Sequence, residues 1–175
     1  MPKKNFRDLQ VKEIKAKLER LKRLPDVLDA ELQDIAYEVR DTARNMAPID
    51  YGGLRSAIQV KRTAATQKGV RGFIKGKSTF FVYINPITPA IGRAENFVGE
   101  YAWSIHEHMG YGTNINVIMP SKRSIEISAS AGEVAGGKFL SRATARYKGK
   151  VNGKLSKVCH KFVNMADFKE NRIDK

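Results

Sequence analysis

The sequence predicts an α+β fold: two N-terminal helices, a mostly antiparallel sheet of four or five strands, and a long C-terminal helix packed on the sheet. Three observations predict it. Apolar residues recur every three or four positions before residue 47, alternate with polar residues after Gly53, and return to helical spacing after Phe139. Between the first two patterns lies the stretch APIDYGGLRSAI, residues 47–58, which marks a switch from helix to strand.

Two helices are predicted before this switch. The first has one apolar face, formed by Val11, Ile14, Leu18 and Leu21. The second begins at Pro25, which is tolerated only in the first turn of a helix, and Asp26 suits the positive end of the helix dipole. Because Pro48 disfavours helical geometry in the preceding residue, we expect this helix to end near Asn45 or Met46.

Short runs of branched and aromatic residues after Gly53 are typical of strands. We expect strands at 58–60, 70–74, 80–84, 117–119 and 125–127, with the second and third forming a hairpin through residues 75–78. The segment 87–99 is expected to be a long loop, a feature that in compact domains is more often functional than idle. Residues 101–108 fit both an alternating strand and a short helix, so periodicity leaves that segment open.

The longest helical pattern runs from Leu140 to Met165. Its apolar residues recur every three or four positions, and lysines and arginines occupy the remaining faces. Gly149 and Gly153 each cost about 1 kcal/mol relative to alanine within a helix. A bend or an interruption is therefore expected near these two glycines.

Length and composition favour one ordinary core. The chain has 175 residues, of which 42% are hydrophobic. We expect a basic N-terminal helix over 1–24, one α+β domain over 25–166 and a flexible tail over 167–175. The single Cys159 excludes an intramolecular disulfide framework. No run approaches the ~18 apolar residues needed to cross a bilayer, and no secretory signal is visible, so we expect a soluble protein without a membrane partner.

The net charge of +14 is concentrated at the two ends of the chain. Residues 1–24 hold 9 basic and 3 acidic side chains, residues 138–175 hold 11 and 3, and the region between them is neutral, with 12 of each. Basic ends can contact DNA or acidic proteins, and Lys148, Lys150 and Lys154 are candidates for such contacts. Equally, lysine-rich faces keep amphipathic helices in solution.

Catalytic and metal-binding patterns are weak. His106, Glu107 and His108 form the one cluster that resembles a metal site, but no third or fourth ligand is visible, and a hydrogen-bonding role is favoured. Neighbouring Cys159 and His160 do not face each other on a helix, which favours an inert thiol. We therefore expect no catalytic residue, no metal site and no cofactor.

Several residues suggest structural or interfacial roles. Asp50, just before Gly52, can bond to the following backbone amides and fix the turn, and Arg55 can pair with it. Tyr101 and Trp103 suit either a core or a subunit interface, because large aromatic side chains are common anchors where subunits meet.

Three motifs in order resemble the tail-completion or neck proteins of long-tailed bacteriophages. The first is matched by Ala47, Pro48, Asp50, Gly52, Leu54, Arg55, Ser56 and Ile58. The second is matched by Tyr101, Ala102, Glu107, Gly112 and Thr113, and the third by Phe139, Leu140 and Ala143. The resemblance covers 26–147, and it departs from the family pattern at Tyr51, at Lys138 and in the longer segment 107–112.

This resemblance implies a non-enzymatic virion component, assembled in the host cytoplasm. It implies a homo-oligomeric ring of six or twelve copies between the head portal, or connector, and the tail-tube or tail-terminator proteins, with DNA in the channel as a further partner. Turn and structural roles fall to Asp50, Gly52, Leu54, Arg55, Gly112 and Thr113, and interface roles to Tyr101, Trp103, His106, Glu107, Phe139 and Leu140. The rivals are a basic, architectural nucleic-acid-binding protein and a hydrolase built around Glu107 and its two neighbouring histidines.

Overall fold

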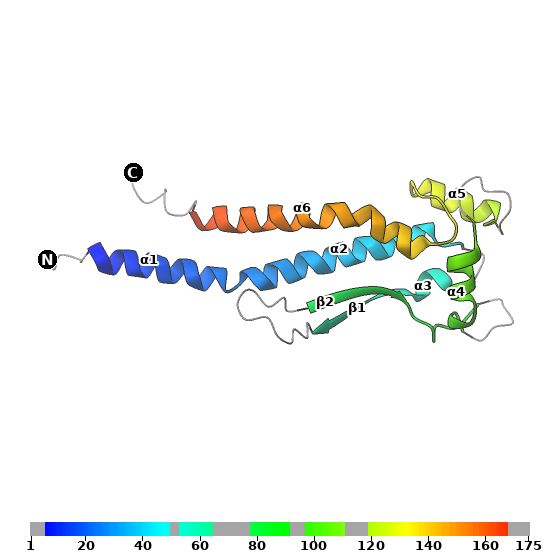
Figure 1. Ribbon diagram of the computed structural model, residues 1–175, viewed down its shortest axis with the longest axis horizontal. Coiled ribbons are helices and arrows are strands. Elements are labelled where there is room, and N and C mark those ends of the chain that lie inside the picture. The colour runs from blue at the N-terminus through cyan, green and yellow to red at the C-terminus, as the bar shows by residue number, and fades with distance from the viewer. Residues whose placement is uncertain (1–5, 50–52, 65–77, 92–96, 111–118, 168–175) are drawn as a thin grey trace.

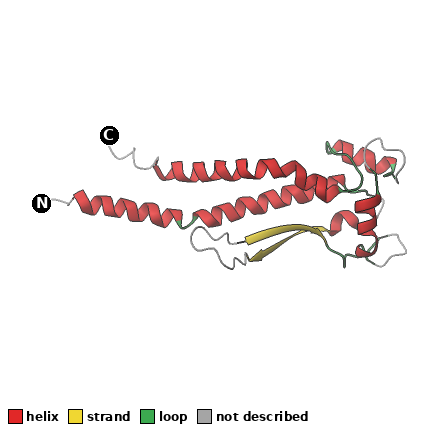
Figure 2. Cartoon of the chain, viewed as in Figure 1, coloured by secondary structure: helices red, strands yellow, loops and turns green. Residues whose placement is uncertain are grey.

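The molecule is an elongated assembly of helices with a small β-ribbon along one side (Figures 1 and 2). The computed structural model describes residues 6–49, 53–64, 78–91, 97–110 and 119–167. Its elements, in chain order, are α1 (Phe6–Leu21), α2 (Leu24–Met46), α3 (Leu54–Ala57), β1 (Ile58–Ala64), β2 (Ser78–Ile84), α4 (Gly99–His108), α5 (Lys122–Ser130) and α6 (Phe139–Asp167).

The helix α2 is the spine of the molecule. It follows α1 almost end to end, α6 runs antiparallel beside it, and the β-ribbon lies on its other side (Figure 1). We call the end where α3, α4 and α5 gather the head end, and the end where α1 begins and α6 finishes the shaft end. The spine therefore connects two ends of different construction.

The boundaries of α2 agree with the predicted ones. Pro25 lies in its first turn, where a missing N–H costs nothing, and Asp26 lies at the positive end of the dipole. The last helical residue is Met46, and Ala47 adopts an extended conformation before Pro48. The predicted end of this helix is confirmed.

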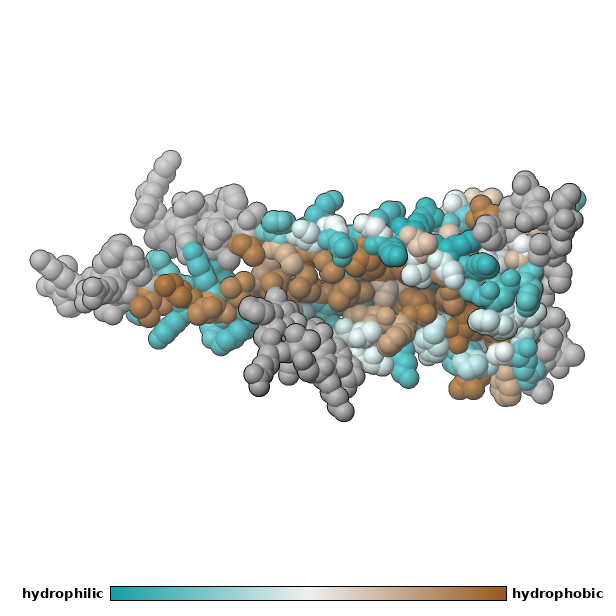
Figure 3. Space-filling view, viewed as in Figure 1, coloured by the Kyte–Doolittle hydropathy of each residue, from teal (hydrophilic) through white to brown (hydrophobic). Residues whose placement is uncertain are grey.

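The pairing of α2 with α6 forms the long part of the core. Ala43 of α2 and Ala143 of α6 are completely buried in the core, and their small side chains allow the two helix backbones to approach closely. The Tyr147 hydroxyl lies 3.3 Å from Thr42 Oγ1, and Lys154 donates to both Glu38 oxygens at 2.6 Å. A continuous band of hydrophobic side chains follows this spine in Figure 3.

The described part of the sheet has two antiparallel strands. Ile58 pairs with Ile84 at one end of the ribbon and Ala64 with Ser78 at the other. The prediction of four or five strands is wrong for the described residues, which contain two, β1 and β2. The hairpin predicted between 70–74 and 80–84 lies partly outside the described residues. The buried Asp29 accepts a bond from Arg62 at 2.5 Å and one from Ser78 at 3.1 Å, which ties the ribbon to α2.

The strand predicted at 125–127 is also wrong, because this segment lies within α5. Ser121 caps the helix by accepting a bond from the Ser124 N–H, and Ser124 and Ser128, one turn apart, are completely buried. Ile125, which suggested a strand, is 46% exposed. Of the strand predicted at 117–119, only Met119 is described, and it lies outside any strand.

The last helix is longer and more regular than predicted. It continues without interruption through Gly149 and Gly153, so the expected interruption does not occur. A Cβ atom added at either glycine would meet nothing within 4 Å, and both residues are exposed. Packing of the apolar face against α2 outweighs their poor helix propensity.

Candidate interaction site

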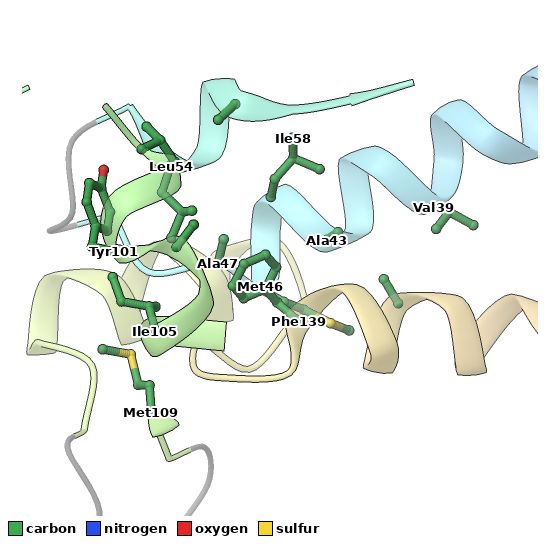
Figure 4. Packing of buried hydrophobic residues seen from close by; sticks show 14 of the residues in the cluster. Val39, Ala43, Met46, Ala47, Leu54, Ile58, Tyr101, Ile105, Met109 and Phe139 are labelled. Carbon is green, nitrogen blue, oxygen red and sulfur yellow. The ribbon is translucent and has the colours of Figure 1, made fainter. Parts of the chain in front are cut away.

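The head end is built around a compact apolar cluster. Leu54 from α3, Tyr101 and Ile105 from α4, and Phe139 from the start of α6 are buried together with the end of α2 (Figure 4). The state of 101–108, which periodicity left open, is helical, with Ala102 and Ile105 on the buried face. Each large apolar side chain buried here contributes roughly 1.5–3 kcal/mol of transfer free energy.

Arg55 closes the carboxyl end of α2. Its Nε donates to the Ala47 carbonyl at 2.8 Å, and its Nη2 donates to the Asn45 carbonyl at 3.4 Å and to Ser128 Oγ at 3.2 Å. Terminal carbonyls of a helix lack partners within the helix, and a cation near them also complements the dipole. The predicted partner, Asp50, lies outside the described residues.

Two serines that sequence reasoning missed complete this junction. Ser128 Oγ donates to the Asn45 carbonyl at 2.5 Å, and the Ile49 N–H donates to Ser124 Oγ at 2.9 Å. The Gly136 N–H donates to the Met46 carbonyl at 3.0 Å. The signal in the sequence was the spacing of Ser121, Ser124 and Ser128, which places a cap and two small polar residues on one helix.

Arg44 makes a second link from α2 to the ribbon. It donates to the Ile58 carbonyl through Nε at 3.1 Å and through Nη2 at 2.8 Å. Burial, reinforced by the nearby Arg40, lowers the pKa of the Arg44 guanidinium, while Asp41 acts in the opposite direction. Because arginine retains its charge in proteins, this link persists across the physiological pH range.

His106 and Glu107 interact with each other. The His106 Nδ1 lies 2.7 Å from the Glu107 Oε1, and the buried ring makes an edge contact with Phe139, with centroids 5.0 Å apart. The Lys138 N–H donates to the His106 carbonyl at 2.5 Å, which fixes the entry of α6 against α4. Among the described residues, no group of three or more histidine, cysteine or acidic side chains is arranged to hold a metal ion.

The side chains predicted at an interface divide into buried and exposed groups. Tyr101 is 5% exposed and Phe139 is fully buried, so both support the head end from within it. Trp103, by contrast, is 71% exposed, on the face of α4 opposite its buried side. Other large apolar residues exposed at this end include Ile87, Ile91, Phe97, Ile125 and Val134.

The remaining predicted residues lie apart from these. Lys148 and Lys150 are exposed on α6, away from the head end, and Lys154 is held by Glu38, whose hydrogen bond raises the pKa of the lysine. Leu140 is partly buried against the core. Gly52, Gly112 and Thr113 lie outside the described residues, as does Asp50.

A comparison of the sequence with family models finds one match, described as "Bacteriophage HK97-gp10, putative tail-component", over residues 12–85. The match runs from α1 to the end of β2 and contains the first of the three motifs; the other two lie beyond it. No curated protein and no solved structure matches the chain significantly. None of the described helices combines the length and hydropathy needed to span a bilayer. Residues 12–85, less than half of the chain, are therefore similar to the HK97-gp10-like family of bacteriophage tail components.

Proposed function

We propose that this protein is a structural component of the virion that completes the tail at the neck. In this proposal, six or twelve copies form a ring that joins the head portal assembly to the tail. The observation that carries the proposal is the match of residues 12–85 to a family of phage tail components. The family match supports a place among virion proteins, and the ring and its position are our inference.

The construction of the molecule suits a ring subunit. A ring requires one surface on each copy and a different, complementary surface on its neighbour. The head end is internally braced by Arg55 and Ser128 and exposes Trp103 and Ile87, which are 71% and 72% accessible. Exposed aromatic and aliphatic anchors on a rigid support are typical of protein interfaces.

The proposal assigns no chemical reaction to the chain. The groups that suggested one have structural partners: His106 pairs with Glu107 and packs on Phe139. Cys159 and His160 are consecutive residues of α6 and therefore project in different directions from the helix. Both arrangements support a scaffold.

A phage lacking this gene tests the proposal. We expect filled heads and separate tails to accumulate, and the wild-type gene supplied in trans to restore joined particles. Trp103→Ser with Ile87→Ser should restore few of them, whereas Phe81→Ser, which removes a half-exposed aromatic residue from the ribbon, should restore most. Normal particles from the deletion mutant, or particles in which electron microscopy finds no density for the chain, would refute it.

A nucleic-acid-binding role is the alternative that the charge distribution favours. Lys148 and Lys150 are exposed on one helix, although Lys154 is already paired with Glu38. Phosphate contacts of this kind predict an affinity that falls linearly with salt on logarithmic axes. If the isolated monomer binds DNA in this way, and changing these three lysines to glutamate abolishes binding while particles still join, the alternative replaces the ring.

A further inference from the structure

The apolar face of α1 is uncovered along the shaft end. Its four large apolar residues are between 46% and 58% exposed, and they are Val11, Ile14, Leu18 and Leu21. None of the described elements packs extensively against α1, which projects beyond the body of the molecule (Figures 1 and 3). A single helix of 16 residues is marginal in water, so packing by another surface would stabilise it considerably.

The charges on α1 and α2 indicate which surface is suited to cover α1. Residues 11–23 carry six basic and two acidic side chains, whereas residues 24–39 carry five acidic side chains and no basic one. Pairing α1 with the α1 of another copy would bring like charges together, which is destabilising. A basic apolar helix is instead complementary to an acidic apolar surface, such as the first half of α2.

A hollow of suitable composition lies between the first half of α2 and the last third of α6. Its volume is about 400 Å³, and it is lined by Val27, Ala30, Glu31, Asp34, Val158, Lys161 and Phe162. Leu18 and Leu21 share their side of α1 with Lys15, Lys22 and Glu19, and Glu19 forms an ion pair with Lys22. Both surfaces combine apolar side chains with charges whose excess is of opposite sign: the hollow has two acidic side chains and one basic one, and this side of α1 has two basic side chains and one acidic one.

The α1 of the same chain does not fill this hollow. It continues the line of α2 away from it (Figure 1), and Leu18 and Leu21 remain about half exposed. We propose that α1 of one copy docks in the α2–α6 hollow of a second copy, with Leu18 and Leu21 on its apolar lining and Lys15 and Lys22 beside Glu31 and Asp34. Because donor and acceptor surfaces differ, the contact can repeat around a ring; in this respect the inference rests on the proposed function and names its subunit contact.

Disulfide cross-linking between two full-length versions of the protein tests this contact. Both versions carry Cys159→Ser; one carries Leu21→Cys and the other Ala30→Cys, with tags of different size. We expect mild oxidation of the mixture to give a mixed dimer on a non-reducing gel. A matched pair in which Ser141→Cys, on an exposed position of α6 near the head end, replaces Ala30→Cys should give little. Equal yields from the two pairs, or no mixed dimer, would overturn the inference.

A charge exchange provides a second test that needs no new disulfide. Lys15→Glu with Lys22→Glu should weaken self-association at least tenfold by sedimentation velocity, and Glu31→Lys with Asp34→Lys should do the same. Mixing the two variants should restore association, because each then offers an α1 that complements the hollow of the other. If α1 binds DNA or another protein instead, the mixture stays dissociated, and the inference fails.

The two proposals can fail separately. If particles contain rings of the chain but the cross-link does not form, the α1 contact is wrong and the structural role stands. If the cross-link forms but the chain is absent from particles, the contact stands and the role in the virion is wrong.

Discussion

The two ends of the molecule differ in how they satisfy their backbone and apolar groups. At the head end, three carbonyls at the end of α2 receive donors from Arg55, Ser128 and Gly136, and Phe139 is fully enclosed. At the shaft end, the α1 residues Val11, Ile14, Leu18 and Leu21 are each about half exposed. One end therefore completes its packing within the chain, whereas the apolar face of the other stays exposed in the described part of the chain.

The largest expected effect is at the centre of the head end. Phe139→Ala should lower the free energy of unfolding by about 3–5 kcal/mol, because it leaves a cavity at a site with no exposure. Urea unfolding measures this. Phe81→Ala, at a half-exposed phenylalanine of the ribbon, is the matched control and should cost less than about 1 kcal/mol. Equal losses would mean that the head end is no better packed than the surface.

Gly137→Ala should lower the free energy of unfolding by about 1–3 kcal/mol or more, because the added methyl group does not fit in the space around it. A Cβ atom at this position would lie 2.0 Å from the Met109 carbonyl oxygen, so the end of α4 must move. The melting temperature reports the effect. Gly149→Ala makes the same chemical change in open space and should not destabilise the protein.

Ser128→Ala should lower the free energy of unfolding by about 1–3 kcal/mol. The Asn45 carbonyl loses its 2.5 Å donor and keeps only the 3.4 Å bond from Arg55, and Arg55 loses an acceptor. Chemical denaturation can compare it with Ser130→Ala, an exposed serine of the same helix. Should the two variants be equally stable, the hydrogen bonds at this junction contribute little.

A stabilising change is expected in the distal part of α6. Gly153→Ala should raise the free energy of unfolding by about 0.5–1 kcal/mol, because alanine loses less backbone entropy in a helix and its Cβ meets no neighbour. Calorimetry at low protein concentration is suitable. A drop in stability would show that Gly153 is not in a regular helix.

The smallest effect on the monomer is expected at the shaft end. Leu21→Ser should change the stability of the dissociated chain by no more than about 0.5 kcal/mol, since Leu21 is already 46% exposed. Leu54→Ala, at a leucine with no exposure, should cost about 2–5 kcal/mol in the same assay. A large loss from Leu21→Ser would mean that α1 is covered within its own chain.

The parts of the fold that were predicted correctly depend on local chemistry. Pro48 fixes the end of α2, and the apolar spacing after Phe139 gives α6. The strand predicted at 125–127 failed because the alternating isoleucines are not the buried residues; the buried ones are the serines between which they lie. Local alternation cannot reveal that Ser128 bonds to α2, since Asn45 precedes it by 83 residues.

At the candidate interaction site, too, the sequence could predict what depends on local chemistry but not the contacts between distant residues. The motif residue Arg55 was predicted to have a structural role beside Asp50. Its observed partners are helix carbonyls and a serine 73 residues later, which no spacing rule connects. Tyr101 and Trp103 are two positions apart in the sequence, and only the helical state of α4 makes one buried and the other exposed. Periodicity had left that state open.

The first and last described helices have their outer ends at the same end of the molecule: α1 begins and α6 finishes at the shaft end (Figure 1). At 1.5 Å per residue, the 29 residues of α6 span about 44 Å. A gold or fluorescent label fused to either terminus would therefore mark one pole of the molecule and keep its bulk away from Trp103. In images of labelled particles, the side on which both labels appear would give the polarity of the subunit directly.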